Sequence, residues 1–168
     1  YACRQTGFAM LAAGSVQEVM DLSGVAHLAT LKTRIPFLNF FDGFRTSHEI
    51  QKIEKINQDK LTALIDQDAL QAFRDRALNP EHPVTRGTAQ NPDIFFQAKE
   101  ACNPFYDAVP DAVEAYMQDI TKITGREYHP FTYYGAKDAE NVIVAMGSVT
   151  ETIREVIDYL NAQGKRYG

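Results

Sequence analysis

The sequence has 168 residues, of which 45% are hydrophobic and 23% are charged, and this composition is typical of a soluble globular chain. Lys and Arg number 17 and Asp and Glu number 22, so the net charge is −5. A mildly acidic chain without a basic block is a poor candidate for binding nucleic acid. No stretch approaches the ~20 apolar residues of a membrane-spanning helix, so we expect no membrane partner either.

The two cysteines, Cys3 and Cys102, are too few for a disulfide framework and indicate a reducing compartment, so we expect a cytoplasmic protein. The chain opens with Tyr1 and shows no signal-peptide pattern. It closes on Gly-Lys-Arg-Tyr-Gly, which is typical of a helix end before the next strand. We therefore expect an internal piece of a longer protein, and the alternative is a processed or tagged small protein.

The first 41 residues predict a βαβ unit. An apolar run at 8–13 predicts a strand. Ser15 followed by Glu18 forms a capping box, which predicts a helix over Val16–Thr33 with a broad apolar stripe. The aromatic run at 36–41 is nearly continuous in apolarity and predicts a strand buried on both faces. A strand, a long helix and a second buried strand together indicate a parallel pair.

The middle of the chain is polar and helical in pattern over residues 47–75, with Asp59 and Asp68 as predicted N-caps of two pieces. Three Asn-Pro steps follow, and each is predicted to break helix and start a turn. These steps are Asn79-Pro80, Asn91-Pro92 and Asn103-Pro104. A helix is predicted over residues 111–124, with Pro110 at its start and Gly125 as its C-cap.

The last part of the chain repeats the strand-Gly-Ser-helix pattern of the first. The β-branched run at 142–146 predicts a buried strand, and Ser148 with Glu151 forms a second capping box that opens a helix. The residue composition changes after Gly125, where an aromatic stretch is followed by a polar one. This change predicts two domains, covering residues 1–127 and 128–168.

The short motifs of the chain carry little chemistry by themselves. Both Gly-Ser turns place backbone N–H groups at a helix N-terminus, a general anion site, but neither matches a dinucleotide or Walker motif, and we favour simple caps. Four histidines lie outside any zinc motif, and His27, in mid-helix, is expected at the core or its edge. They are His27, His48, His82 and His129. Two distant cysteines cannot hold an iron–sulfur cluster, and no nucleophile elbow is present.

The richest segment is residues 40–49, which carry Asp, Arg, Thr, Ser, His and Glu directly after the second predicted strand. Open α/β sheets place ligands at the carboxyl ends of their strands. Asp42 and Arg45 are therefore the strand-end candidates for a site. Thr46 or Ser47 is expected to cap the following helix, which leaves Arg45 to hold a carboxylate or a partner domain, or to form only a surface ion pair.

Several motifs, spread in collinear order over the whole chain, closely resemble pyruvate:ferredoxin (flavodoxin) oxidoreductase. They are Arg4-Gln5-Thr6-Gly7-Phe8, the stretch 40–54, Asn79-Pro80-Glu81-His82-Pro83 and Arg86-Gly87-Thr88-Ala89-Gln90-Asn91-Pro92-Asp93. The last of these resembles the long single-chain pyruvate type.

The resemblance implies a large multidomain homodimer that uses thiamine diphosphate, Mg²⁺, coenzyme A and [4Fe–4S] clusters. It would convert pyruvate to acetyl-CoA and CO₂ and pass electrons to ferredoxin or flavodoxin. The implied fold is α/β. Residues 1–127 would form the C-terminal half of the parallel-sheet domain that binds the pyrimidine end of thiamine diphosphate. Residues 128–168 would form the first strand-helix unit of a transketolase C-terminal-like domain.

The same resemblance places the chemistry outside this chain. The threonine and arginine that contact pyruvate, and the glutamate that activates the aminopyrimidine, are expected before Tyr1, while the Gly-Asp-Gly metal site belongs to a late domain. We therefore assign no catalytic, cofactor-binding or metal residue, and keep only Asp42 and Arg45 as strand-end candidates. The piece alone is expected to be inactive, to hold no cofactor and to fold marginally. The alternative is a stand-alone, non-catalytic α/β binding or scaffold module.

Overall fold

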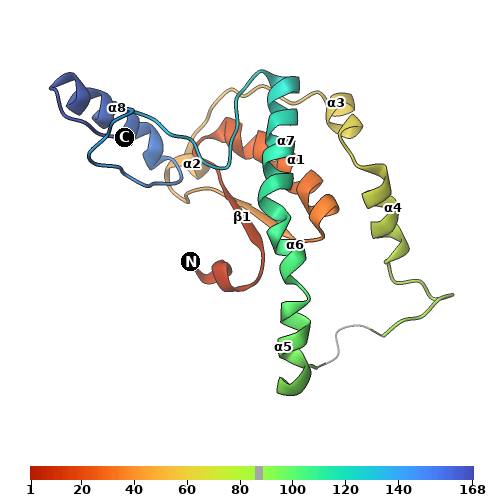
Figure 1. Cartoon of the computed structure of the whole chain (residues 1–168). Coiled ribbons are helices and arrows are strands. Elements are labelled where there is room, and N and C mark those ends of the chain that lie inside the picture. Colours follow the sequence, from red (N-terminus) through yellow and green to blue (C-terminus); the bar gives the residue numbers. More distant parts are fainter. Residues whose placement is uncertain (86–88) are drawn as a thin grey trace.

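The computed structural model describes residues 1–85 and 89–168. After a short 3₁₀ helix, η1 (Ala2–Gln5), strand β1 (Ala9–Ala12), helix α1 (Val16–Thr33) and strand β2 (Phe37–Phe40) follow in order (Figure 1). The two strands pair in parallel, with Ala9 opposite Phe37 and Ala12 opposite Phe40. The predicted βαβ unit is confirmed, and the chain has an α/β fold with a small parallel sheet.

Helix α1 begins and ends where the sequence predicts. Ser15 is its N-cap, and its hydroxyl accepts the backbone N–H of Glu18 at 3.2 Å. The Glu18 carboxylate accepts the N–H of Gly14 instead of that of Ser15, so the capping box is shifted by one residue on its return side. Arg34 ends the helix in the left-handed region, with φ 64°.

The strands differ from the sequence prediction in burial. Residues in both strands are half-buried, whereas the run at 36–41 predicted a strand buried on both faces. Leu11 and Phe37 pack against the core. Met10 and Leu38 alternate to the other face and remain partly exposed. The prediction of full burial is wrong because apolarity alone does not show which face of a strand is covered.

The core lies between α1, β2 and helix α7 (Val109–Thr124), which packs against α1 (Figure 1). Its buried members are Ala13, Leu22, Val25, Ala29, Ile56, Val113, Met117 and Ile120. The predicted ends of α7 are confirmed, because Pro110 lies in its first turn and Gly125 caps it with φ 76°.

Three short helices cross the middle of the chain, and residues 49–57 between the first two are not helical. They are α2 (Arg45–His48), α3 (Gln58–Ala63) and α4 (Gln67–Asp75). The caps of α3 and α4 are Asn57 and Asp66, so the prediction of Asp59 and Asp68 is wrong. Asp59 and Asp68 lie in the first turns, where a carboxylate still favours the helix dipole.

The Asn-Pro steps behave in two ways. Asn79-Pro80 lies in a turn closed by a bridge between Asn79 and His82, as predicted. The other two steps instead open helices α5 (Pro92–Glu100) and α6 (Asn103–Asp107), because proline is well tolerated in a first helical turn. Residues 86–88 of the Arg-Gly-Thr-Ala-Gln motif lie outside the described residues.

The last segment contains α8 (Val149–Ala162), which confirms the predicted helix, but no strand at 142–146. Val144 is 94% exposed. This segment forms a single parallel bridge, between Asn141 and Tyr167. Next to it, the Ile143 N–H donates to the Gly168 carbonyl at 2.8 Å. The buried-strand prediction is wrong here because a strand exists only where a neighbour pairs along its length.

The packing of α7 on α1 leads to a testable expectation for the full-length protein that carries this chain. Ile120 is fully buried, so Ile120→Ala leaves a cavity and should lower the free energy of unfolding by about 2–4 kcal/mol. Ile50 lies fully exposed, and Ile50→Ala should change it by less than about 0.5 kcal/mol. Hydrogen exchange of the α1 and α7 amides measures both, and equal effects would contradict this core.

Candidate functional site

Three turns gather at one place, and two of them follow the strands. Gly14 follows β1, Asp42 follows β2, and Gly147 follows the extended segment 142–146. A Cβ atom at position 14 would lie 3.2 Å from the carbonyl oxygen of Gly147 and 3.3 Å from Oγ1 of Thr150. The two Gly-Ser turns, far apart in the sequence, therefore touch, and glycine at position 14 permits that approach.

Asp42 joins these turns. Its carboxylate accepts the backbone N–H of Thr46 at 2.9 Å and the hydroxyl of Thr46 at 3.2 Å. It also accepts the backbone N–H of Ser148 at 3.0 Å. Hydrogen bonds from Ser148 first, and then from the Thr46 backbone, hold the pKa of the Asp42 carboxyl well below its usual range. Asp42 thus remains ionised at neutral pH, which suits an anchor and not a proton donor.

The helix caps around Asp42 differ from the sequence prediction. Thr46 and Ser47 lie inside α2, so neither caps it, and Asp42 supplies the carboxylate instead. Ser148 makes no side-chain cap to α8, and the second capping box is therefore wrong. The backbone N–H of Ser148 is used by Asp42, while Thr150 bonds to the carbonyl of Gly147. The Asp42 carboxylate, 106 positions away in the sequence, therefore occupies the N-terminal end of α8, where an anion could otherwise bind.

Arg45 also faces the last segment of the chain. It lines a polar cavity of about 530 Å³ together with Tyr134 and one side of α8. The α8 residues in this cavity are Glu151, Thr152, Arg154, Glu155 and Asp158. Tyr134 donates to Asp158 at 2.7 Å, and its ring carries the guanidinium of Arg154. The structure therefore brings both strand-end candidates, Asp42 and Arg45, against the segment 128–168.

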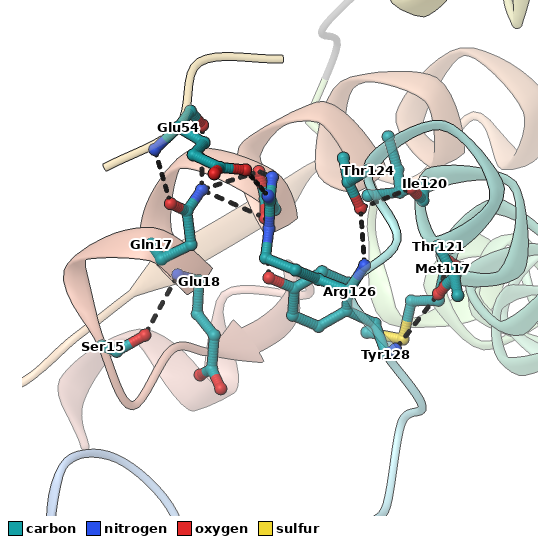
Figure 2. A network of polar contacts seen from close by, with 11 residues as sticks. Ser15, Gln17, Glu18, Glu54, Met117, Ile120, Thr121, Thr124, Arg126 and Tyr128 are labelled. Atoms are coloured by element: carbon teal, nitrogen blue, oxygen red, sulfur yellow. Dashed lines mark hydrogen bonds and ion pairs between the residues drawn. The ribbon is translucent and has the colours of Figure 1, made fainter. Parts of the chain in front are cut away.

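A second polar cluster was not predicted from the sequence (Figure 2). The carboxylate of Asp21, in the second turn of α1, is fully buried. Arg126 binds it twice, with Nε at 2.6 Å and Nη2 at 3.1 Å, and the Tyr128 hydroxyl donates to it at 2.6 Å. Gln17 donates to the same carboxylate at 3.2 Å. We call these residues, with Glu54, the Asp21 cluster.

The Asp21 cluster fixes two loops onto α1. The Arg126 Nη1 atom reaches the carboxylate of Glu54 at 2.9 Å, and Gln17 exchanges hydrogen bonds with the Glu54 backbone. Asp21 raises the pKa of Arg126, while burial and then Asp21 raise the pKa of Tyr128. The Asp21 carboxylate thus binds a cationic guanidinium and a protonated phenol. The cluster therefore holds the segment that follows α7 against α1. The sequence signal for this cluster is the acidic residue Asp21 among the apolar residues of α1.

The histidines occupy separate places. His27 is exposed in the middle of α1 instead of lying at the core or its edge as expected. His82 closes the turn that starts at Asn79, and His48 lies 2.8 Å from the Ser47 hydroxyl. His129 lies between Glu114 and Glu127, and its hydrogen bonds to these carboxylates, Glu114 first, raise the pKa of the imidazole. Over residues 1–85 and 89–168 no group of three or more His, Cys, Asp or Glu side chains is arranged to hold a metal ion.

Residues 1–118 match the family described as "Pyruvate flavodoxin/ferredoxin oxidoreductase, thiamine diP-bdg". The chain belongs to this family. It is 64% identical over its whole length to the "Pyruvate-flavodoxin oxidoreductase" of Enterobacter agglomerans and 65% identical over 99% of its length to that of Klebsiella pneumoniae. The "Pyruvate:ferredoxin oxidoreductase" of Moorella thermoacetica is 61% identical over 99% of the chain.

The chain spans only 14% of the length of each of these oxidoreductases. The resemblance expected from the motifs is confirmed, and the chain is a small part of the proteins that it matches. Among the described helices, none combines the length and the apolarity that crossing a membrane would require.

The Asp21 cluster predicts a large effect of losing one charge. In Asp21→Asn the partly buried Arg126 guanidinium loses its buried counter-ion and keeps only the exposed Glu54, so the free energy of unfolding should fall by about 3 kcal/mol. The matched control is Glu54→Gln. The Glu54 side chain is 84% exposed, and its loss should cost less than about 1 kcal/mol. Hydrogen exchange of the α1 and α7 amides in the full-length protein measures both values, and an Asp21→Asn effect as small as that of the control would refute this role of the cluster.

Proposed function

We propose that this chain is part of a pyruvate:ferredoxin or flavodoxin oxidoreductase, which converts pyruvate and coenzyme A to acetyl-CoA and CO₂ and passes the two electrons to its acceptor protein. The observation that carries the proposal is the identity of 60% or more, over essentially the whole chain, to proteins that bear these names. The printed names include both acceptors, flavodoxin and ferredoxin, so either one fits.

Within that enzyme we infer that residues 1–127 form the C-terminal half of the pyrimidine-type thiamine-diphosphate domain. Residues 128–168 would open a transketolase C-terminal-like domain. The family match over residues 1–118 supports the first assignment. The parallel contact of Asn141 with Tyr167 across α8 supports the second, because it has the topology of a strand-helix-strand unit. The Asp21 cluster then lies at the junction of the two domains.

The described residues do not fit thiamine diphosphate by themselves. This cofactor requires an acid at its aminopyrimidine and a metal ion at its diphosphate. The carboxylate of Asp42 is engaged by Thr46 and Ser148, and the N-terminus of α8 is engaged by Asp42. We therefore propose that other parts of the parent protein hold thiamine diphosphate, Mg²⁺ and the [4Fe–4S] clusters.

The role that remains for this chain is positional. Asp42 binds the backbone of two helices that belong to different proposed domains, so it fixes their relative placement. Arg45 faces the carboxylates of α8 in the adjoining cavity. We assign both as positioning residues of the parent enzyme, which we take to be a cytoplasmic homodimer.

The proposed function is tested with the full-length protein that carries this chain. We expect reduction of flavodoxin or ferredoxin that requires both pyruvate and coenzyme A, with acetyl-CoA as product. A coding sequence that ends at these 168 residues, or a full-length protein without this activity, would favour the scaffold module instead.

The 168-residue chain alone should not bind the cofactor. We expect the acid to lie elsewhere in the parent protein, and the described residues hold no metal-ligand set, so calorimetry at about 1 mM thiamine diphosphate with Mg²⁺ should show no binding. The full-length enzyme is the positive control. Micromolar affinity of the isolated chain would show that the site lies within these residues.

Loss of Arg45 should impair the full-length enzyme. Arg45→Ala removes one of the two arginines that line the cavity with the α8 carboxylates, so dimer stability or pyruvate turnover should fall at least ~10-fold, about 1.4 kcal/mol. Arg74→Ala, on the exposed side of α4, is the matched control and should behave as wild type. Wild-type turnover and unchanged dimer dissociation in Arg45→Ala would contradict the positioning role and show that Arg45 forms only a surface ion pair.

A further inference from the structure

An apolar groove of about 330 Å³ lies between α1 and the segment 55–65 that includes α3. Its apolar walls are Met20, Leu28, Leu31, Ile56, Leu61 and Ile65. Gly24 forms part of α1 at this point, and a Cβ atom there would lie 3.2 Å from Cδ1 of Leu61. The absence of a side chain at Gly24 therefore allows Leu61 to lie close to the α1 backbone along the groove.

The charges at the groove have one sign. Two of its lining residues are titratable, His27 and Lys55, both exposed, and neither Asp nor Glu lines it. The neutral polar groups come from Ser23, Gln58 and Thr62. An apolar hollow with a lysine and a histidine among its lining residues is complementary to a ligand with a hydrocarbon body and an anionic head.

The size of the groove suits a small molecule. Its volume is near the lower limit of about 300–1,000 Å³ for small-molecule sites. We propose that the groove binds a small amphipathic monocarboxylate, with its chain along Met20 and Leu61 and its carboxylate at Lys55.

The test uses the full-length enzyme and a photoreactive octanoate analogue with a diazirine at its hydrocarbon end. Labelled peptides are identified by mass spectrometry. We expect label within residues 20–31 or 55–65, displaced by octanoate at about millimolar concentration but not by octanol. Lys55→Glu should reduce this label at least ~10-fold. Lys52→Glu, an exposed lysine outside the groove, should leave it unchanged.

A second pair of variants tests the hollow itself. Thr62 is exposed on α3, so Thr62→Trp can fill the groove without burying a polar group and should abolish the label, whereas Thr62→Ser should keep it. Absence of label in the wild-type enzyme, which a covering domain of the parent protein would produce, overturns the proposal. Equal displacement by octanol, or equal labelling of the Lys55→Glu and Lys52→Glu variants, overturns it as well.

Discussion

The carboxylate of Asp42 connects the end of β2 to two helices that are distant in sequence. It accepts the N–H of Thr46 in α2 and the N–H of Ser148 at the start of α8. In open α/β sheets the carboxyl ends of the strands are where ligands are usually bound. Here the anion that occupies this edge belongs to the protein, so the edge of this small sheet serves to join two segments of the chain.

The Asp21 cluster adds a second contact of this kind, at the second turn of α1. Arg126 and Tyr128 bind the buried Asp21 carboxylate, and the hydroxyls of Thr124 and Thr121 accept the backbone N–H groups of the same two residues (Figure 2). A buried ion pair is weak evidence for stability, but the loss of one partner is costly. The cluster therefore specifies where the chain leaves α7, while Asp42 specifies where α8 begins.

The sequence predicts best those features that residues close together in the chain determine. The bounds of α1 follow from local signals, namely the cap at Ser15 and an apolar stripe, and they were predicted correctly. The cap at Asn57 was missed because several nearby polar residues are equally good caps. The strand at 142–146 was wrongly predicted because pairing depends on a neighbour. Asp42 could be placed at the edge of the sheet, but its partner Ser148 lies 106 positions away.

The most direct test of this account compares Asp42→Asn with Asp42→Ala in the full-length enzyme. Asp42 accepts the N–H of Thr46 on Oδ1 and the N–H of Ser148 on Oδ2, so asparagine, with one oxygen, keeps only one of these two hydrogen bonds and alanine keeps neither. If Asp42 is an anchor, Asp42→Asn keeps pyruvate turnover within about 10-fold of wild type, and Asp42→Ala lowers the temperature of thermal inactivation. A general acid or base would lose roughly 100-fold or more in Asp42→Asn. Such a loss, with thermal inactivation unchanged in both variants, would contradict the account.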